Sequence, residues 1–188
     1  MNLQSAARVA MVFAQTYHEE NFITEDERAG LVAWARAMEP HFVDNKFGPF
    51  RRAAQIHKLP TVDPLFKVVQ RRVIEAMNLS EDTPKEQQLG AYLSVISPGG
   101  AVQRHRDPTP EGTRHLRCNI FLQLPESGAR PMIVDVPVSV ATRSLLAFYP
   151  SELVHSSEAF GGDRERILLS FGFTVSNEHR LPIRKRQR

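Results

Sequence analysis

Three residues have the types and spacing of a metal-binding set: His105, Asp107 and His155. The first two form a His-x-Asp sequence. On a strand their side chains would point to the same side, because strand side chains alternate with a period of two. The third follows roughly fifty residues later, where one strand is expected to end and another to begin. Two imidazoles and one carboxylate can occupy one face of a metal ion and leave the opposite face open.

This donor set is the facial triad of non-haem Fe(II) oxygenases, whose open positions accept a bidentate co-substrate and then O₂. His-x-Asp alone is a weak signal in a chain with seven histidines. Two other interpretations stay open. The histidines could be incidental in a metal-free barrel, or the barrel could be of the cupin type with another metal or activity.

Arg166 strengthens the case for a functional site. It lies in the run RERILLSFGF, where alternation places Ile167, Leu169 and the following phenylalanines on one face and Arg166 on the other. A cation fixed inside a barrel needs an anion beside it, because an unpaired buried charge is unfavourable. A guanidinium pairs well with a carboxylate.

A second strand, HLRCNIFLQL, shows the same division. Leu116, Cys118 and Ile120 share its apolar face, whereas Arg117 and Asn119 share the other face with Phe121. Two strands therefore each direct an arginine to one side, and a dicarboxylate would satisfy both. Arg117 could instead be exposed at a sheet edge. The apolar-face cysteine is expected to serve packing rather than catalysis.

The elements that position these residues can be predicted from the hydrophobic pattern, which changes near residue 90. The first half reads helical, with a capping box at Thr24 and Glu27 and an N-cap with a following proline at Asp63-Pro64. Residues 45–60 read as a loop or short extended piece, and residues 80–88 as a polar connector. From Leu89 onward short alternating runs are broken by Pro and Gly. These runs are AYLSVIS, HLRCNIFLQL, MIVDVPV, SLLAFY and RILLSFGFTV.

The expected fold is therefore α+β and mainly β. A double-stranded β-helix core of the jelly-roll or cupin-like type would carry N-terminal helices packed on it. Residues 1–88 would be the supporting helical region, residues 89–178 the catalytic core and residues 179–188 a basic tail, in a single domain overall. This fits a chain of 188 residues.

Composition and charge argue against some classes of protein. The hydrophobic fraction of 41% and the charged fraction of 24% are ordinary globular values. The net charge is +3, but residues 180–188 carry five cations and no acid, so the remainder carries −2. The body is therefore not a surface that coats nucleic acid. The basic end could contact an anionic partner, although a solvated, disordered end is favoured.

The chain is expected to be cytoplasmic. Its single cysteine cannot form an intrachain disulfide, and no apolar run approaches the ~20 residues that span a membrane. The N-terminal segment reads as a helix rather than a signal peptide, because its apolar stretch is short and Arg8 interrupts it. The sequence does not indicate an oligomeric state.

Residues 89–175, nearly half of the chain, resemble the Fe(II)- and 2-oxoglutarate-dependent oxygenases with a double-stranded β-helix. They are most similar to the aspartyl/asparaginyl β-hydroxylase-like group and the bacterial proline hydroxylases. Three stretches carry the resemblance: SVISPGGAVQRHRDPT, HLRCNIFLQLP and HSSEAFGGDRERILLSFGF.

The resemblance implies that His105, Asp107 and His155 bind Fe(II). It implies that Ser94 and Arg166 hold the far carboxylate of 2-oxoglutarate, and that Arg117 lies near its metal-chelating end. Arg164 is a rival for the carboxylate role. Tyr92 lies on the Ser94 face and could line the pocket, although a core tyrosine is the simpler interpretation.

The chain departs from these families in several places. It keeps Asp107, which the animal β-hydroxylases lack, and has Asn119 where they have a histidine. Val102 and Ile96 occupy positions where prolyl 4-hydroxylases often have tyrosine. Phe47, Phe50, Arg51 and Arg52 fall where this superfamily often builds a substrate lid, although a structural loop is as plausible.

The expected function is hydroxylation, with Fe(II), 2-oxoglutarate and O₂, of an amino acid or an amino-acid side chain in a peptide or protein. The substrate class rests on the resemblance alone. One alternative is nucleic-acid dealkylation, which the basic tail suggests but FGFTV disfavours, because dealkylases usually carry a further arginine there. The other is a non-catalytic metal- or ligand-binding barrel that works through a partner.

Overall fold

The computed structural model describes residues 3–46 and 48–183. Three α-helices occur in this part of the chain: α1 (Leu3–Ala14), α2 (Glu25–Met38) and α3 (Pro64–Ala76). Two short 3₁₀ helices also occur there: η1 (Glu39–His41) directly follows α2, and η2 (Ile56–Lys58) precedes α3. None of the described helices is long and apolar enough to cross a bilayer.

The starts of α2 and α3 follow from their first residues. Thr24 Oγ1 accepts the N–H of Glu27 at 3.1 Å, and the Glu27 carboxylate accepts the N–H of Thr24 at 2.8 Å. This capping box satisfies two backbone donors that a helix end otherwise leaves unpaired. Asp63 caps α3 by accepting the N–H of Leu65 at 2.8 Å. Both predicted helix starts are confirmed.

A seven-stranded antiparallel sheet forms the centre of the molecule, in the order β1-β9-β5-β12-β4-β3-β2. Its strands are β1 (Thr16–Glu19), β2 (Val43–Asp44), β3 (Arg51–Gln55), β4 (Ala91–Ile96), β5 (Thr113–Gln123), β9 (Leu145–Phe148) and β12 (Arg166–Ser176). A three-stranded sheet contains β10 (His155–Ser157), β7 (Pro131–Ile133) and β8 (Val136–Pro137), and a two-stranded sheet pairs β11 (Phe160–Gly161) with β6 (Ser127–Gly128).

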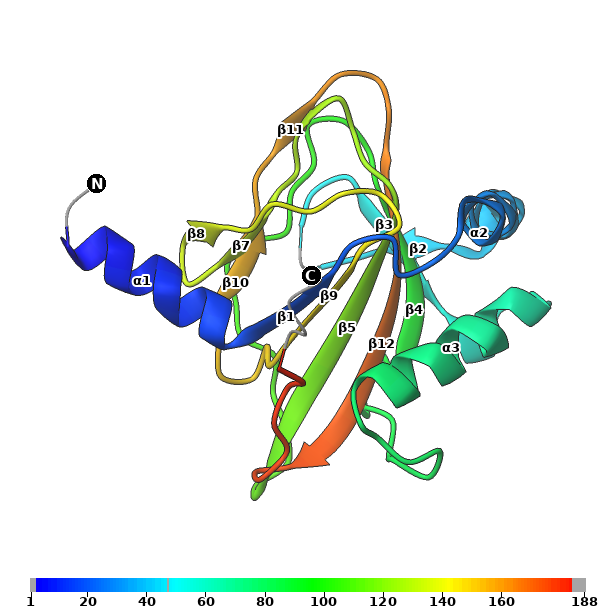
Figure 1. The fold of residues 1–188 in the computed structure, drawn as a ribbon. Coiled ribbons are helices and arrows are strands. Elements are labelled where there is room, and N and C mark those ends of the chain that lie inside the picture. Colours follow the sequence, from blue (N-terminus) through cyan, green and yellow to red (C-terminus); the bar gives the residue numbers. More distant parts are fainter. Residues whose placement is uncertain (1–2, 47, 184–188) are drawn as a thin grey trace.

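The elements form three layers (Figure 1). Helices α2 and α3 cover one face of the large sheet, and the small strands β7, β8 and β10 lie over its other face. The main apolar core lies under the helices and includes Leu31, Val69, Ile120 and Phe171. A smaller apolar cluster, which includes Phe121, Ile133 and Leu168, lies on the opposite side. The prediction of a mainly β fold with helices packed on it is confirmed.

The first half of the chain is less purely helical than its sequence indicates. It supplies β1, β2 and β3 to the large sheet. The segment 45–60, expected to be a loop or short extended piece, contains β3, which pairs along its whole length with β4. Strands of two to five residues carry too few positions for a clear alternating pattern. The run MIVDVPV, expected as one strand, is a hairpin that turns at Val134 and Asp135, where φ is positive.

Candidate metal and anion site

The triad is assembled between the two larger sheets. His155 begins β10, and His105 pairs with it in an isolated antiparallel bridge. The rest of the His-x-Asp segment is not in a strand, but Asp107 N–H donates to Pro150 O at 3.0 Å and so holds the main chain that carries the carboxylate. One ligand atom from each of the three side chains lies within 4.8 Å of the others. The structure therefore brings the predicted set together.

The orientation of both imidazoles suits metal binding. Nδ1 of His105 lies 2.7 Å from Gln103 O, and Nδ1 of His155 lies 3.2 Å from Leu153 O. When these nitrogens donate to the carbonyls, each Nε2 keeps its lone pair. Nε2 of His105 and of His155 face Asp107 Oδ1 at 3.3 and 4.0 Å.

The charge states of His155 and Asp107 also suit a metal. Burial, followed by the nearby His105, lowers the pKa of His155 to about 4. Burial opposes ionisation of Asp107, but the neighbouring His105 side chain and the charge of Arg117 hold its pKa well below the usual range. At neutral pH His155 is therefore a neutral imidazole and Asp107 a carboxylate, the forms that ligate metals.

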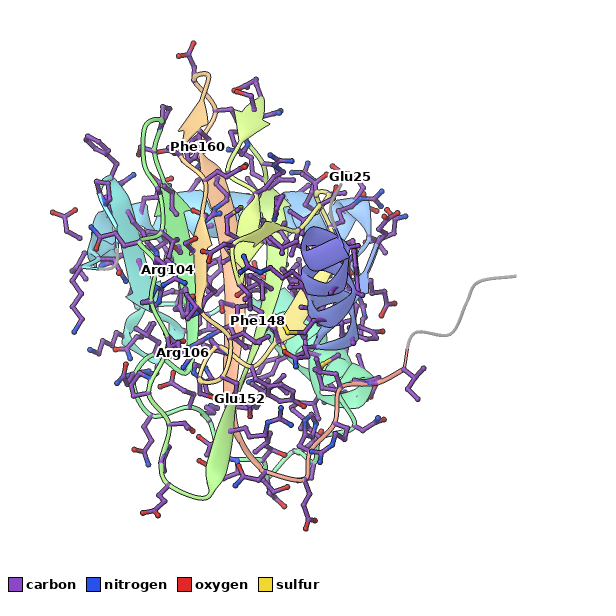
Figure 2. All side chains as sticks on the ribbon, turned by 90° about the vertical axis from the view of Figure 1, so that its left-hand side faces the viewer. Glu25, Arg104, Arg106, Phe148, Glu152 and Phe160 are labelled. Carbon is purple, nitrogen blue, oxygen red and sulfur yellow. The ribbon has the colours of Figure 1, made fainter. Side chains whose placement is uncertain are left out.

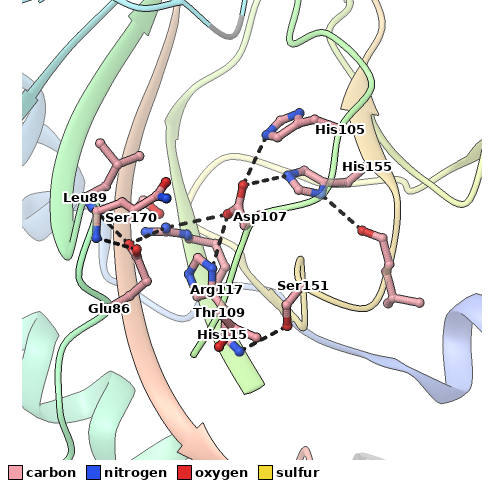
Figure 3. Close-up of polar contacts among 12 residues, drawn as sticks. Glu86, Leu89, His105, Asp107, Thr109, His115, Arg117, Ser151, His155 and Ser170 are labelled. Carbon is pink, nitrogen blue, oxygen red and sulfur yellow. Dashed lines mark hydrogen bonds and ion pairs between the residues drawn. The ribbon is translucent and has the colours of Figure 1, made fainter. Parts of the chain in front are cut away.

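The second oxygen of Asp107 faces two buried side chains from β5. His115 Nδ1 lies 3.3 Å and Arg117 Nη2 lies 3.8 Å from Oδ2 (Figure 3). His115 is 1% exposed, and burial lowers its pKa to about 3, so it is neutral. Neither ring nitrogen of His115 makes a hydrogen bond of good geometry with the residues that the structure describes.

Arg117 already has a counter-ion. Its Nη2 lies 3.1 Å from Glu86 Oε2, and its Nη1 donates to Gly90 O at 3.0 Å. Glu86 also accepts backbone N–H groups of Gln88, Leu89 and Gly90, and so fixes the connector that precedes β4. Arg117 lies beside the triad, but its charge is neutralised by Glu86.

Arg166 projects into the same space between the sheets. Its side chain is 5% exposed, Nη1 donates to Ala129 O at 3.0 Å, and Nε has no hydrogen-bond partner within the described ranges. Burial, followed by the charge of Arg51, lowers its pKa to about 10, so it remains a cation at neutral pH.

One cavity joins these groups. It is lined by the triad, by Arg117, Arg166, Tyr92 and Asn119, and by apolar side chains that include Val102, Phe121 and Phe148. Figure 2 views the molecule from the side of the small sheet, where the segment with Arg104 and Arg106 crosses in front of the large sheet. Metal donors and a buried cation therefore share one cavity.

Neither a protein family model nor a curated protein matches the chain. Solved structures do match. A prolyl hydroxylase in complex with a peptide fragment, from Trichoplax adhaerens, has a TM-score of 0.67 at 12% identity, and the match covers 94% of this chain and 93% of that one. A Pseudomonas putida prolyl-4-hydroxylase has a TM-score of 0.63 at 16% identity, covering 93% and 100%. HygX from Streptomyces hygroscopicus, with nickel, 2-oxoglutarate and hygromycin B bound, has a TM-score of 0.63 at 13% identity, covering 95% and 88%.

This chain is a double-stranded β-helix. Its two larger sheets enclose the cavity, and the strands that carry Arg166 and His155 belong to different sheets. That arrangement places the predicted cation and the predicted metal donors on facing walls. The prediction of a double-stranded β-helix core is therefore confirmed.

The other residues predicted for the site contact protein side chains in this structure. Ser94 is buried, and its Oγ accepts from Arg51 Nε at 3.2 Å. Asn119 Oδ1 accepts from Ser170 Oγ at 2.8 Å. The rival Arg164 is exposed and faces Glu126 at 3.4 Å, outside the cavity. The functional roles of these residues stay predictions.

Other expectations fall at the edge of the structure or outside it. Phe47 and residues 184–188 lie outside the described residues. Phe50 is 66% exposed, and Arg52 faces Glu39 and Glu165 rather than the cavity. Cys118 is buried on the helix-facing side, and burial raises its pKa, in agreement with a packing role.

Three residues of the double-stranded β-helix were missed by sequence reasoning: Arg51, Glu86 and His115. His115 could have been found, because it lies on the polar face of its strand with Arg117 and Asn119. Arg51 was placed in a possible lid, whereas it lies in β3 and lines the cavity. Glu86 lies in a polar connector, and no sequence signal distinguishes it from its neighbours.

Proposed function

We propose that this chain is an Fe(II)- and 2-oxoglutarate-dependent dioxygenase that hydroxylates an amino acid or an amino-acid side chain in a peptide or protein. The observation that carries the proposal is the cavity that contains two imidazoles and a carboxylate within 4.8 Å of one another together with the buried cation Arg166.

The donor chemistry fits the metal. Two neutral imidazoles and one carboxylate are the ligands that non-haem Fe(II) sites use, and a divalent ion would neutralise the buried Asp107. Carbonyl oxygens of Gln103 and Leu153 hold the two rings through Nδ1, so each Nε2 would be available to a metal. Bound iron would supply the activation of O₂, which amino-acid side chains cannot provide.

The co-substrate also fits. 2-Oxoglutarate has a metal-chelating keto acid at one end and a carboxylate at the other. Arg166 has an Nε–H without a partner among the described residues and would bind the far carboxylate. The apolar wall with Phe121, Phe148 and Leu168 would exclude water from the space between these ends.

The neighbours support the cofactors more than the substrate. HygX was crystallised with nickel and 2-oxoglutarate, and a viral collagen prolyl hydroxylase with 2-oxoglutarate. Their other partners differ, because one neighbour binds a peptide fragment and HygX binds hygromycin B. The neighbours therefore do not agree on one substrate class, and the amino-acid or peptidyl substrate is proposed from the sequence resemblance. The location that we propose, the cytoplasm, would be checked by fractionation.

The test is an anaerobic titration of metal-free protein with Fe(II) and 2-oxoglutarate, which follows the visible metal-to-ligand charge-transfer band. We expect the band in wild type, its loss in His105→Ala and a weaker affinity for 2-oxoglutarate in Arg166→Ala. Arg164→Ala is the matched control, because Arg164 is exposed and two residues away.

A well-folded wild type without the band would contradict the proposal. A band without succinate formation in air, across amino-acid and peptide substrates, would instead favour a non-catalytic binding barrel.

A further inference from the structure

Arg51 is a buried cation for which the described protein provides no counter-ion. Its side chain is 6% exposed. Its hydrogen-bond acceptors are hydroxyls: Ser94 Oγ lies 3.2 Å from Nε, and Tyr92 OH lies 3.4 Å from Nη2. No carboxylate of the described chain lies within 4.0 Å of it, and no hydrogen bond from its Nη1 is found. A buried charge in this state is unfavourable unless an anion joins it.

Arg51 and Arg166 lie at the same level of the large sheet, but their guanidinium groups contact different parts of the cavity. Both residues pair with Ile96, from either side of β4, so their Cα atoms lie about 10 Å apart. Arg166 reaches Ala129 next to the small sheet. Arg51 follows β4 toward Tyr92, and its guanidinium lies 5.9 Å from the centre of the Tyr92 ring. The two side chains therefore present separate positions for anions.

The charges that line the cavity lead to the same conclusion. Three arginines and two carboxylates line it: Arg51, Arg117, Arg166, Glu86 and Asp107. Arg117 is paired with Glu86. A divalent metal would be neutralised by Asp107 and the chelating carboxylate of 2-oxoglutarate. The far carboxylate would neutralise Arg166. One positive charge, that of Arg51, remains.

We propose that Arg51 binds a carboxylate of the primary substrate, so that the enzyme acts on a molecule with a free carboxylate near the position that is hydroxylated. This inference rests on the proposed function and narrows its substrate class. The hydroxyls of Ser94 and Tyr92 hold the guanidinium plane, and Nη1 and the second N–H of Nη2 remain for a two-point contact with a carboxylate. Ser94, expected to contact 2-oxoglutarate, then acts as a positioning residue for Arg51.

The test separates the two carboxylate sources with protein loaded with Ni(II), which binds 2-oxoglutarate without turnover. Calorimetry would measure the Kd of 2-oxoglutarate for wild type, Arg51→Gln, Arg51→Lys and Arg166→Gln. Acetate is then titrated into the complex with saturating 2-oxoglutarate, and the rise in Tm is compared with chloride at equal ionic strength. Acetamide, which has the same shape without the charge, is the ligand control.

Arg52→Gln is the matched protein control, because Arg52 is adjacent but faces Glu39 and Glu165 at the surface. We expect Arg166→Gln to weaken 2-oxoglutarate binding by roughly tenfold or more, and Arg51→Gln by less than about threefold. Acetate, but not acetamide, should raise the Tm of wild type and Arg52→Gln. The effect should disappear in Arg51→Gln and return in part in Arg51→Lys, which keeps the charge.

Three results would overturn the inference. The first is a loss of 2-oxoglutarate affinity in Arg51→Gln as large as in Arg166→Gln, which would assign Arg51 to the co-substrate. The second is an acetate effect that persists in Arg51→Gln, and the third is no acetate effect in wild type. If wild type did not bind 2-oxoglutarate, the proposed function itself would be contradicted. The calorimetric titration shows this result independently of the acetate experiment.

Discussion

His105 and His155 are joined by two backbone hydrogen bonds, from His105 N to His155 O at 3.0 Å and from His155 N to His105 O at 2.9 Å. This bridge brings the centres of the two rings to 4.2 Å. Because the backbone sets the spacing, the two imidazoles are held near each other without a metal. Asp107, which lacks such a bridge, depends on its contacts with His115 and Arg117.

Substitution of His115 should separate metal affinity from stability. His115→Phe removes the ring nitrogen that faces Asp107 Oδ2 at 3.3 Å, and we expect Ni(II) affinity to fall about 10–100-fold. It also removes two buried ring nitrogens without good hydrogen bonds among the described residues, so the free energy of unfolding should be unchanged or higher. Calorimetry with Ni(II) and urea unfolding measure the two effects. Unchanged metal affinity would show that His115 does not support Asp107.

Acid should destabilise the metal-free protein before the carboxylates titrate. The folded-state pKa values of His155, about 4, and His115, about 3, lie below the usual histidine value of 6.5. Between these values the unfolded chain binds more protons, so the free energy of unfolding decreases as the pH falls from about 6.5 to 4. Each group contributes up to ~1.4 kcal/mol per pH unit in that range.

The measurement is urea unfolding in EDTA at several pH values. His115→Phe should reduce the slope, whereas a substitution of the exposed His57, His57→Gln, should leave it unchanged. A wild-type stability that does not change between pH 6.5 and 4.5 would contradict the assigned pKa values.

Glu86→Gln should be strongly destabilising. It removes the nearer of the two carboxylates that face the buried Arg117 guanidinium, and it weakens the acceptor of three backbone N–H groups. Loss of one member of a buried ion pair typically lowers the free energy of unfolding by about 3–5 kcal/mol. Glu81→Gln is the control, because Glu81 and its partner Arg71 are 76% and 72% exposed and should contribute less than about 1 kcal/mol. Equal effects of the two substitutions in urea unfolding would exclude this role for Glu86.

Gly172 leaves the space that Arg117 needs. The two residues are paired across β12 and β5, and a Cβ on Gly172 would lie 2.7 Å from Arg117 Nη1 and 3.0 Å from Glu86 Cβ. We expect Gly172→Ala to cost about 1–3 kcal/mol and to lower metal affinity, because Arg117 also contacts Asp107. Gly161→Ala is the control, since a Cβ there meets Ser127 Oγ at an ordinary 3.5 Å. Identical melting of the two variants would show that Arg117 can move aside.

Much of the site could be predicted from local patterns. The alternation in β5 and β12 correctly divided helix-facing from cavity-facing residues, because a strand has a fixed period of two that does not depend on its neighbours. The helix starts at Thr24 and Asp63 were equally local, since a cap is formed by a side chain and the backbone two or three residues away.

The sequence by itself therefore determined the residue types of the metal set, the division of β5 and β12 into two faces, and the helix starts. Only the tertiary structure decided which charges are paired. Glu86 neutralises Arg117 from 31 residues away, whereas Arg51, which the sequence left in a possible lid, is buried against hydroxyls. The physical reason is that the state of a buried charge depends on groups brought near it by non-local strand pairing. That pairing is not encoded in the spacing of neighbouring residues.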